Sequence, residues 1–210
     1  MQSKLSTEPI PNSLLEFIEK GYRLHDEAHD VGHVWLVFNN ALEIILMRKM
    51  QLTDEQWKVL PYLTLCHDLL DHKQPIENKL PAEEVFSFYE QELGHDLATV
   101  ISYIHDNCSW SKRAKSHPVT IPGYEHYEQL RLLLQDSDWL EAIGHGGIER
   151  CRQCQSTWFP TKTPEQIKAR IHAHMDEKLF LVYDAFNFDE TRRIADQRNL
   201  INPMVEFRNA

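Results

Sequence analysis

The sequence predicts an all-α protein, and three observations favour that fold class. Glycine is scarce, with seven residues in a chain of 210, while helix-forming residues are abundant. No stretch alternates polar and apolar residues in the way that a half-buried strand does. Helix start signals recur along the chain. We therefore expect a single compact helical bundle over residues 1–210, with its core at about 20–207 and flexible residues at 1–12.

Eight helices are expected, and the clearest of them begin with capping signals. Residues 53–56, Thr-Asp-Glu-Gln, fit a capping box, in which the threonine and glutamine side chains satisfy backbone groups of the first turn. Residues 163–166 repeat this pattern, with Pro164 at the first helical position. Pro61 is expected to kink or restart the third helix, and 108–123 is expected to be the longest loop. In chain order, the helices are expected at about 13–26, 33–50, 54–72, 81–94, 95–107, 124–142, 164–184 and 188–207.

The charge balance limits the partners of the chain. The sequence has 22 Lys and Arg against 32 Asp and Glu, a net charge of −10. A protein that binds a nucleic-acid polymer usually presents a basic face, so we expect no such partner. A small anionic substrate stays compatible, because a bound metal or a local Lys or Arg overrides the overall charge.

Secretion and membrane insertion are not expected. Residues 1–11 contain no apolar run of the kind found in a signal peptide. No 18-residue apolar stretch is present, so no segment is expected to span a membrane. Four cysteines do not make a disulfide scaffold. The cytoplasm is therefore the expected compartment.

The dipeptide His67-Asp68 is the most informative feature of the chain. His-Asp occurs five times, but only this pair lies in a stretch, residues 60–70, that is otherwise almost wholly apolar. An imidazole and a carboxylate that are buried together need partners, because an unpaired buried charge is very costly. A divalent cation suits both groups.

Helical periodicity predicts which other polar residues face inward. His33 shares a helix face with apolar residues four, eight and eleven positions later. Asp138 follows leucines by four and eight positions, whereas Asp136 points elsewhere. His67 follows leucines by four and seven positions, with Asp68 one step round the helix. Three helices are thus expected to direct two histidines and two aspartates into the interior.

The order of these residues resembles the HD-domain superfamily of metal-dependent phosphohydrolases, which are helical bundles. Residues 29–33 resemble its HDxxH segment, and residues 67–73 resemble HDxxDxK. Residues 136–144, Asp-Ser-Asp-Trp-Leu-Glu-Ala-Ile-Gly, resemble the DADxLDAIG segment of one bacterial subgroup. Residues 174–179 resemble the HxxEKL segment of that subgroup. The resemblance implies hydrolysis of nucleotide phosphate bonds, including those of nucleoside triphosphates.

The resemblance also implies a metal site formed by His33, His67, Asp68 and Asp138. Two imidazole nitrogens and two carboxylate oxygens suit one divalent transition metal better than magnesium. Manganese is the expected ion, with iron, cobalt, nickel and zinc as alternatives. The expected function is metal-activated hydrolysis of a phosphate ester or anhydride in a nucleotide or another small phosphorylated metabolite.

Five further residues are candidates for catalysis or substrate binding. Asp71 lies one turn beyond the central histidine and is expected to orient or deprotonate the attacking water. Lys73 follows the central motif, and Lys178 lies one turn from His174, so these side chains are expected to bind substrate charge. Lys178 has the alternative of covering apolar surface with its stem. His29 is a candidate for substrate binding or for orienting the first ligand, with a surface histidine as the alternative.

Two departures from the family pattern concern the substrate. The subgroup usually carries arginines where this chain has Leu36 and Trp139, so a smaller or less anionic substrate than a triphosphate is expected. His145 is expected either to contact substrate or to lie in a loosened, glycine-rich helix end. Cys151 and Cys154 form a CxxC pair without a second pair, which does not complete a zinc site.

Two other classes of function remain open. A dinuclear phosphodiesterase or iron oxygenase of the same superfamily needs two more histidines between the second and third motifs. A non-enzymatic, metal-stabilised module would bind metal without turnover. Substrate identity and oligomeric state, a homodimer included, are not predicted. The histidines available to a dinuclear site are His95, His105, His117 and His126.

Overall fold

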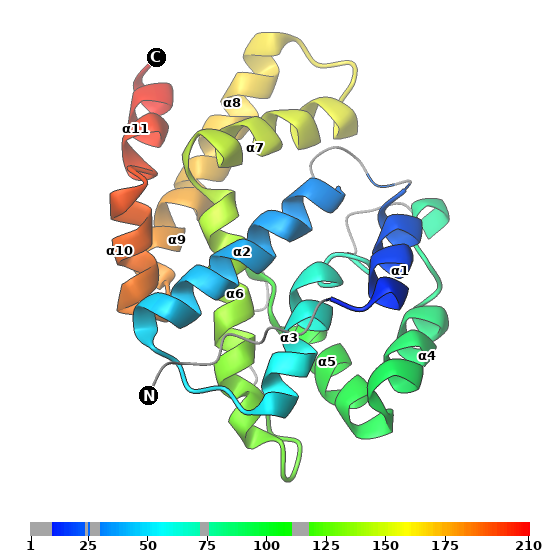
Figure 1. Ribbon diagram of the computed structural model, residues 1–210. Helices are drawn as coiled ribbons and strands as arrows, with labels where there is room; N and C mark the ends of the chain where they lie inside the picture. Colours follow the sequence, from blue (N-terminus) through cyan, green and yellow to red (C-terminus); the bar gives the residue numbers. More distant parts are fainter. Residues whose placement is uncertain (1–9, 24, 26–29, 72–75, 111–117) are drawn as a thin grey trace.

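Helices form all the regular structure in the part of the chain that the computed structural model describes (Figure 1). Within that part no strand occurs, so the predicted all-α class is confirmed. No helix there is both long and apolar enough to cross a membrane. The described residues are 10–23, 25, 30–71, 76–110 and 118–210.

Besides the α-helices, the described residues contain two 3₁₀ turns, at Ile76–Asn78 (η2) and Glu125–Tyr127 (η4), and a π-helical turn at Met175–Leu179. In chain order the helices are α1 (Asn12–Tyr22), α2 (Val31–Arg48), α3 (Asp54–Leu65), α4 (Ala82–Leu93), α5 (His95–Asn107), α6 (Glu128–Ala142), α7 (Gly144–Trp158), α8 (Pro164–His174), α9 (Phe180–Ala185), α10 (Asp189–Gln197) and α11 (Ile201–Asn209).

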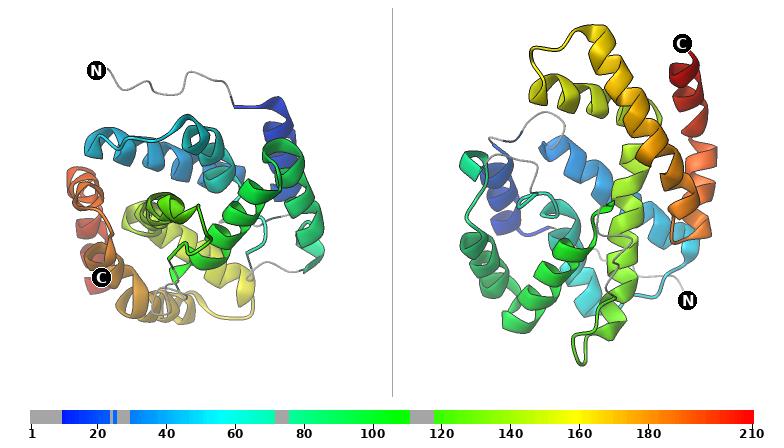
Figure 2. Two further views of the ribbon diagram at one scale, coloured as in Figure 1. Left: turned by 90° about the horizontal axis from the view of Figure 1, so that it is seen from below. Right: turned by 180° about the vertical axis from the view of Figure 1, so that it is seen from behind.

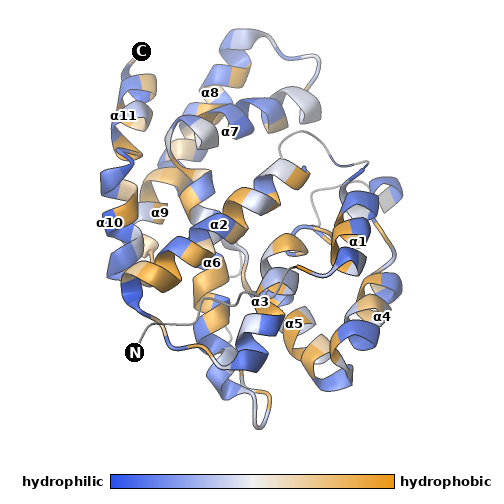
Figure 3. Cartoon of the chain, in the orientation of Figure 1, coloured by the Kyte–Doolittle hydropathy of each residue, from blue (hydrophilic) through white to orange (hydrophobic). Residues whose placement is uncertain are grey.

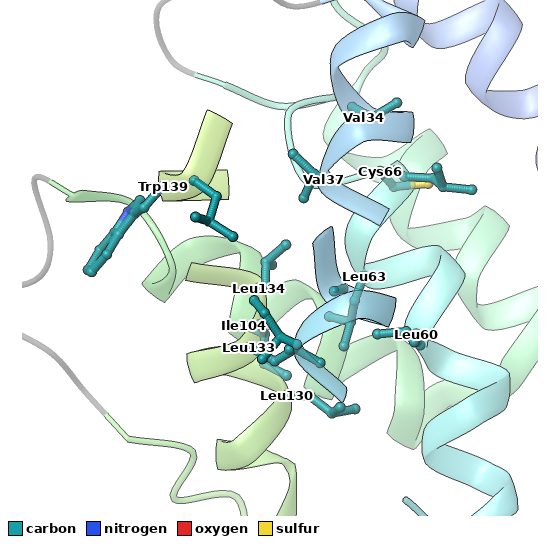
Figure 4. Close-up of a cluster of buried hydrophobic side chains, with 14 of the residues drawn as sticks. Val34, Val37, Leu60, Leu63, Cys66, Ile104, Leu130, Leu133, Leu134 and Trp139 are labelled. Carbon is teal, nitrogen blue, oxygen red and sulfur yellow. The ribbon is translucent and has the colours of Figure 1, made fainter. Parts of the chain in front are cut away.

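The helices α2, α3 and α6 meet at the centre of the molecule. α2 packs most extensively against α6, and α4 and α5 pack as a pair to one side of them (Figures 1 and 2). The helices α7 and α8 form a second pair at the opposite end. Apolar residues gather where the central helices meet, while α8 and α10 are mostly hydrophilic (Figure 3). Figure 4 shows part of this core, with Val34, Val37, Leu60, Leu63, Ile104, Leu130, Leu133 and Leu134 buried together.

Both predicted capping boxes are present. The Thr53 hydroxyl accepts a hydrogen bond from the Gln56 backbone at 3.1 Å, and the Gln56 side chain accepts one from the Thr53 backbone at 3.0 Å. Thr163 and Gln166 make the same reciprocal pair at the start of α8. These bonds satisfy donors that a helix start leaves unpaired, and they position the beginnings of α3 and α8.

The prediction of a helix over 54–72 was wrong at its C-terminal end. α3 ends at Leu65, and the chain continues through tight turns in which Leu69 donates to Cys66 and Asp71 donates to Asp68. Pro61 lies within α3 and does not end it. His67 and Asp68 therefore lie in the turn that follows α3, where helical periodicity no longer applies.

The helix α7 was not predicted. Its start, Gly144 to Gly147, was interpreted as a loosened helix end, but it begins a helix of 15 residues. Gly144 adopts a φ of 79°, which lets the chain turn sharply between α6 and α7 (Figure 1). A Cβ at Gly147 would lie 2.1 Å from the Ala142 carbonyl oxygen, so glycine is needed where α7 starts against α6. The glycines that obscured this helix in the sequence therefore also allow α7 to pack against α6.

Two long predicted helices are interrupted. The expected helix 164–184 is divided by the π-helical turn between α8 and α9. The expected helix 188–207 is divided into α10 and α11, with Asn199 in the left-handed region at a φ of 52°. Asparagine tolerates that conformation better than most residues, because its short side chain can bond locally.

Candidate metal centre

Four predicted ligands converge on one point from three parts of the chain. His33 lies in the first turn of α2, His67 and Asp68 lie in the turn after α3, and Asp138 lies near the end of α6. The His33 Nε2 atom is 3.5 Å from an Asp68 oxygen and 3.4 Å from an Asp138 oxygen. The His67 Nε2 atom is 3.3 Å and 3.8 Å from oxygens of the same two aspartates. The expected convergence is therefore present in the structure.

These distances fit a shared cation. Atoms that each lie about 2.1 Å from one ion are about 3.0 Å apart at right angles and about 3.4 Å apart in a tetrahedron. The observed separations of 3.3–3.8 Å are close to these values. His33, His67 and Asp68 by themselves present ligand atoms that all lie within 4.8 Å of one another. Small movements of the side chains would bring four donors to bonding distance.

The buried imidazole nitrogens support the same conclusion. Within the described residues, Nε2 of His33 and Nε2 of His67 are buried and make no hydrogen bond. Such atoms are rarely left without a partner in a native protein. The other nitrogen of His67, Nδ1, lies 2.8 Å from the Thr64 carbonyl oxygen and donates to it. That bond leaves Nε2 directed at the two aspartates, where it can bind a metal once it has given up its proton.

The charges of the centre are strongly coupled. Burial lowers the pKa of His67, but attraction to Asp68 and contact with Asp138 outweigh it and raise the pKa to about 9. Burial raises the pKa of Asp68, yet His67 and His33 hold it below the usual range, and the same holds for the pKa of Asp138. The carboxylates are therefore ionised, and binding of a divalent ion would displace a proton from an imidazole.

The α2 start explains how His33 reaches this point. The carboxylate of Asp30 accepts a hydrogen bond from the His33 backbone N–H at 3.0 Å and caps the helix. α2 consequently begins at Val31, before the predicted residue 33. The His33 side chain then faces inward with Val37 and Ala41, as the periodicity predicted.

A cavity of about 460 Å³ opens beside three of the four predicted ligands. It is lined by His67, Asp68 and Asp138, and by residues of α4, α5, α7 and the π-helical turn. The predicted residues Asp71, His174 and Lys178 all line it. Lys73 and His29 lie outside the described residues. The site thus gathers three of the five additional candidates around one space.

Sequence reasoning missed the arginine of this cavity. Arg150 extends from α7, the unpredicted helix, and lines the cavity together with Lys178. The two positions where the family resemblance expects arginine do not supply charge here. Leu36 is 51% exposed, and Trp139 is 1% exposed and packs against Trp110 at a ring separation of 5.2 Å.

Asp136 was expected to point away from the site, and it performs a separate buried role. It is fully buried and accepts hydrogen bonds from the backbone and side chain of Asn187, the backbone of Phe188 and the hydroxyl of Thr191, at 2.7–3.0 Å. Burial raises the pKa of Asp136 to about 6, against the opposing effect of these donors. Asp136 therefore joins α6 to the start of α10.

The remaining histidines form no second metal site within the described residues. Nε2 of His105 lies 2.9 Å from the Leu63 carbonyl oxygen, and burial lowers the pKa of this imidazole to about 4. His95 bonds to Glu90 at the surface, and His126 is exposed and stacks with Tyr124. His145 is exposed on α7, and His117 lies outside the described residues. Cys151 and Cys154 are free thiols.

Comparisons with known proteins support the fold. No protein-family model and no curated protein matches the sequence. Among solved structures, Bacillus subtilis YpgQ in complex with ADP is similar, with a TM-score of 0.64 and 22% identity over 93% of this chain and 91% of that one. A Lactobacillus plantarum protein is similar at a TM-score of 0.68 and 20% identity, covering 96% of each chain. The chain therefore shares a fold with these proteins along nearly its whole length.

Proposed function

We propose that this protein is a metal-dependent phosphohydrolase of the HD-domain type, acting on a nucleotide or another small phosphorylated metabolite. The observation that carries the proposal is the meeting of His33, His67, Asp68 and Asp138 beside a cavity. The last three of them line this cavity, which also contains cationic side chains. The sequence motifs support it. So does the ADP named in the complex of the structurally similar YpgQ, which is a phosphate compound.

The four ligands would hold one divalent transition metal. Two nitrogen and two oxygen donors suit manganese, iron, cobalt, nickel or zinc. When bound, such an ion polarises a phosphoryl group and acidifies a water molecule. One ion is favoured over two, because His105 directs Nε2 at the Leu63 carbonyl oxygen and the other described histidines between the motifs are exposed.

The other residues of the cavity have roles that follow from their chemistry. Asp71 lies at the cavity wall three residues after Asp68 and can orient or deprotonate the attacking water. Lys178 supplies a positive charge for phosphate oxygens, and His174, one turn before it, is placed to donate to them. Lys73 and His29 are proposed for substrate contact on the motif resemblance alone.

A hydrolysis screen tests the proposal. The protein would be incubated with Mn²⁺ and a panel of nucleotides and phosphomonoesters, beside the Asp68→Ala variant and an Asp96→Ala control on the exposed face of α5. We expect metal-dependent release of phosphate or pyrophosphate that Asp68→Ala abolishes and Asp96→Ala retains. Metal binding without turnover of any compound would instead identify a metal-stabilised module. Turnover that is equal in all three proteins would contradict the proposal.

A further inference from the structure

The cavity beside the ligands has two chemically different ends. One end is cationic and is formed by Arg150 of α7 with His174 and Lys178. The other end is formed by Ala82, Val85, Phe86 and Tyr89 of α4, with Ser102, His105 and Asp106 of α5. In Figure 1 the α4–α5 pair lies at the lower right and the α7–α8 pair at the top, with the ligand-bearing segments between them. A molecule that fills the cavity meets both environments.

The cations of the cationic end lie in one region of the cavity. Arg150 and Lys178 both lie close enough to Cys151 to oppose the effect of burial on its thiol, which raises the pKa of Cys151 to about 11. The two cations therefore face the same neighbourhood, although they come from different elements. Gly147 sets the position of Arg150, because its missing side chain lets α7 start against the Ala142 carbonyl. Arginine and lysine together can hold the oxygens of one phosphate group.

The number of charges limits how anionic the substrate can be. Four carboxylates line the cavity, those of Asp68, Asp71, Asp106 and Asp138. A divalent ion balances two of them, and Arg150 and Lys178 balance the other two. Among the described residues that line the cavity, Arg150 and Lys178 are the Lys and Arg side chains, and the carboxylates already match them. A nucleoside triphosphate would add about four negative charges to this described lining, whereas a phosphomonoester adds about two. Electrostatic repulsion therefore favours the monoester.

The α4 end suits an apolar or aromatic group. Val85 and Tyr89 are each 1% exposed, so they form a fixed wall, and Phe86 is half-buried beside them. The Tyr89 and His105 rings meet edge to face at 6.0 Å. His105 stays neutral at physiological pH because burial lowers its pKa to about 4. Binding sites for organic groups are commonly lined by apolar and aromatic side chains with a few polar atoms among them.

We propose that the substrate is a phosphomonoester with a planar aromatic group, its phosphate held by Arg150 and Lys178 and its aromatic group placed against Phe86 and the α4 wall. The proposal rests on the proposed phosphohydrolase function and narrows its substrate class. In the reaction, a water oxygen forms a bond to phosphorus and the ester bond between phosphorus and oxygen breaks. The leaving oxygen takes a proton, so an alcohol or phenol and inorganic phosphate are released.

The unaltered protein can be tested with substrates that differ either in the aromatic group or in the number of phosphates. p-Nitrophenyl phosphate and adenosine monophosphate would be compared with glycerol 3-phosphate, which lacks the aromatic group, and with adenosine triphosphate, which carries more charge. We expect kcat/KM for the two aromatic monoesters to exceed that for glycerol phosphate and for the triphosphate by roughly tenfold or more.

Two variants with matched controls test which end of the cavity binds the aromatic group and which binds the phosphate. Phe86→Ala is expected to raise KM for aromatic monoesters by roughly tenfold and to leave KM for glycerol phosphate unchanged. Phe88→Ala removes another α4 ring, which stacks on Phe17 at a centroid distance of 3.8 Å. In the protein that folds, this variant is expected to leave KM unchanged for aromatic monoesters and for glycerol phosphate. Arg150→Gln is expected to lower kcat/KM for all esters by roughly 10–100-fold, whereas Arg152→Gln, on the exposed side of α7, is not.

The outcomes separate the two proposals. Metal-dependent turnover that prefers the triphosphate, or that ignores the aromatic group and is unaffected by Phe86→Ala, would overturn the substrate class and leave the phosphohydrolase function standing. Absence of any turnover that depends on Asp68 would overturn the function itself.

Discussion

Asp136 and Asp138 are two residues apart on α6, yet their carboxylates have unrelated partners. Asp138 faces the imidazoles of His33 and His67, whereas Asp136 accepts hydrogen bonds from the segment Asn187–Thr191. Asp138 is therefore the proposed metal ligand, whereas Asp136 joins α6 to the start of α10. The difference follows from helical geometry, because residues two positions apart on a helix do not share a face.

The substitution of each aspartate by asparagine should separate these roles. Asp138→Asn is expected to lower metal affinity at least tenfold, because it removes a ligand. It is also expected to lower the unfolding temperature of the metal-free protein, because the carboxylate is a charge partner of His33 and His67. Asp136→Asn turns an acceptor into an amide that faces donors, and it is expected to cost about 1–3 kcal/mol of stability while retaining metal. Calorimetric metal titration and thermal unfolding would measure both. A loss of metal binding in folded Asp136→Asn protein would contradict the assignment.

Substitutions of Asp71 and Asp68 should have different effects on metal content and turnover. Asp71→Asn removes a group that orients or deprotonates water, so it is expected to lower kcat by about 10²–10⁴-fold with full metal content. Asp68→Ala removes a ligand, so it is expected to lose both metal and measurable turnover. Steady-state kinetics with metal analysis would distinguish them. An Asp71→Asn protein that has lost its metal would show that this residue is a ligand instead.

At the scale of elements, the start of α7 against α6 controls the position of Arg150. Gly147→Ala would place a Cβ 2.1 Å from the Ala142 carbonyl oxygen, so we expect a loss of about 1–3 kcal/mol or more and reduced activity. Gly146→Ala is the matched control, since nothing lies within 4 Å of its added Cβ, and the helix should gain up to about 1 kcal/mol. Chemical denaturation would measure both. Equal stability of the two variants would contradict the close contact.

The neutral histidine of α5 gives the stability a defined pH dependence. The folded state binds a proton at His105 only near pH 4, because burial lowers its pKa to about 4, whereas the unfolded chain binds one near pH 6.5. Stability should therefore fall as the pH falls from 6.5 to 4, by about 2–4 kcal/mol from this residue. His105→Gln can keep the bond to the Leu63 carbonyl and should remove this part of the dependence. Unfolding in the presence of a chelator would measure it, and parallel pH curves for the two proteins would contradict it.

Helical periodicity identified some site residues and could not identify others. His33 and Asp138 lie within α2 and α6, so their inward direction followed from the spacing of apolar residues. His67 lies beyond the end of α3, where the argument from phase failed but the apolar surroundings still indicated burial. Arg150 could not be found, because α7 starts with glycines and contains few apolar residues to mark its period.

At the scale of the whole molecule, the fold brings the site together from segments that are far apart in the chain. α2 and α6 cross at the centre, and this packing joins His33 to Asp138. The overall charge of −10 contrasts with a cavity that contains both Arg150 and Lys178. Sequence composition could exclude a nucleic-acid polymer as an expected partner, but only the packed helices reveal this local grouping of cations.

The central claim is that two histidines and two aspartates hold one divalent metal ion. Anomalous diffraction from crystals of the protein grown with Mn²⁺ tests it most directly. We predict a single strong anomalous peak about 2.0–2.3 Å from Nε2 of His33, Nε2 of His67 and one oxygen each of Asp68 and Asp138. The absence of a peak at that point in crystals that contain manganese, or a peak held by other residues, would contradict the account.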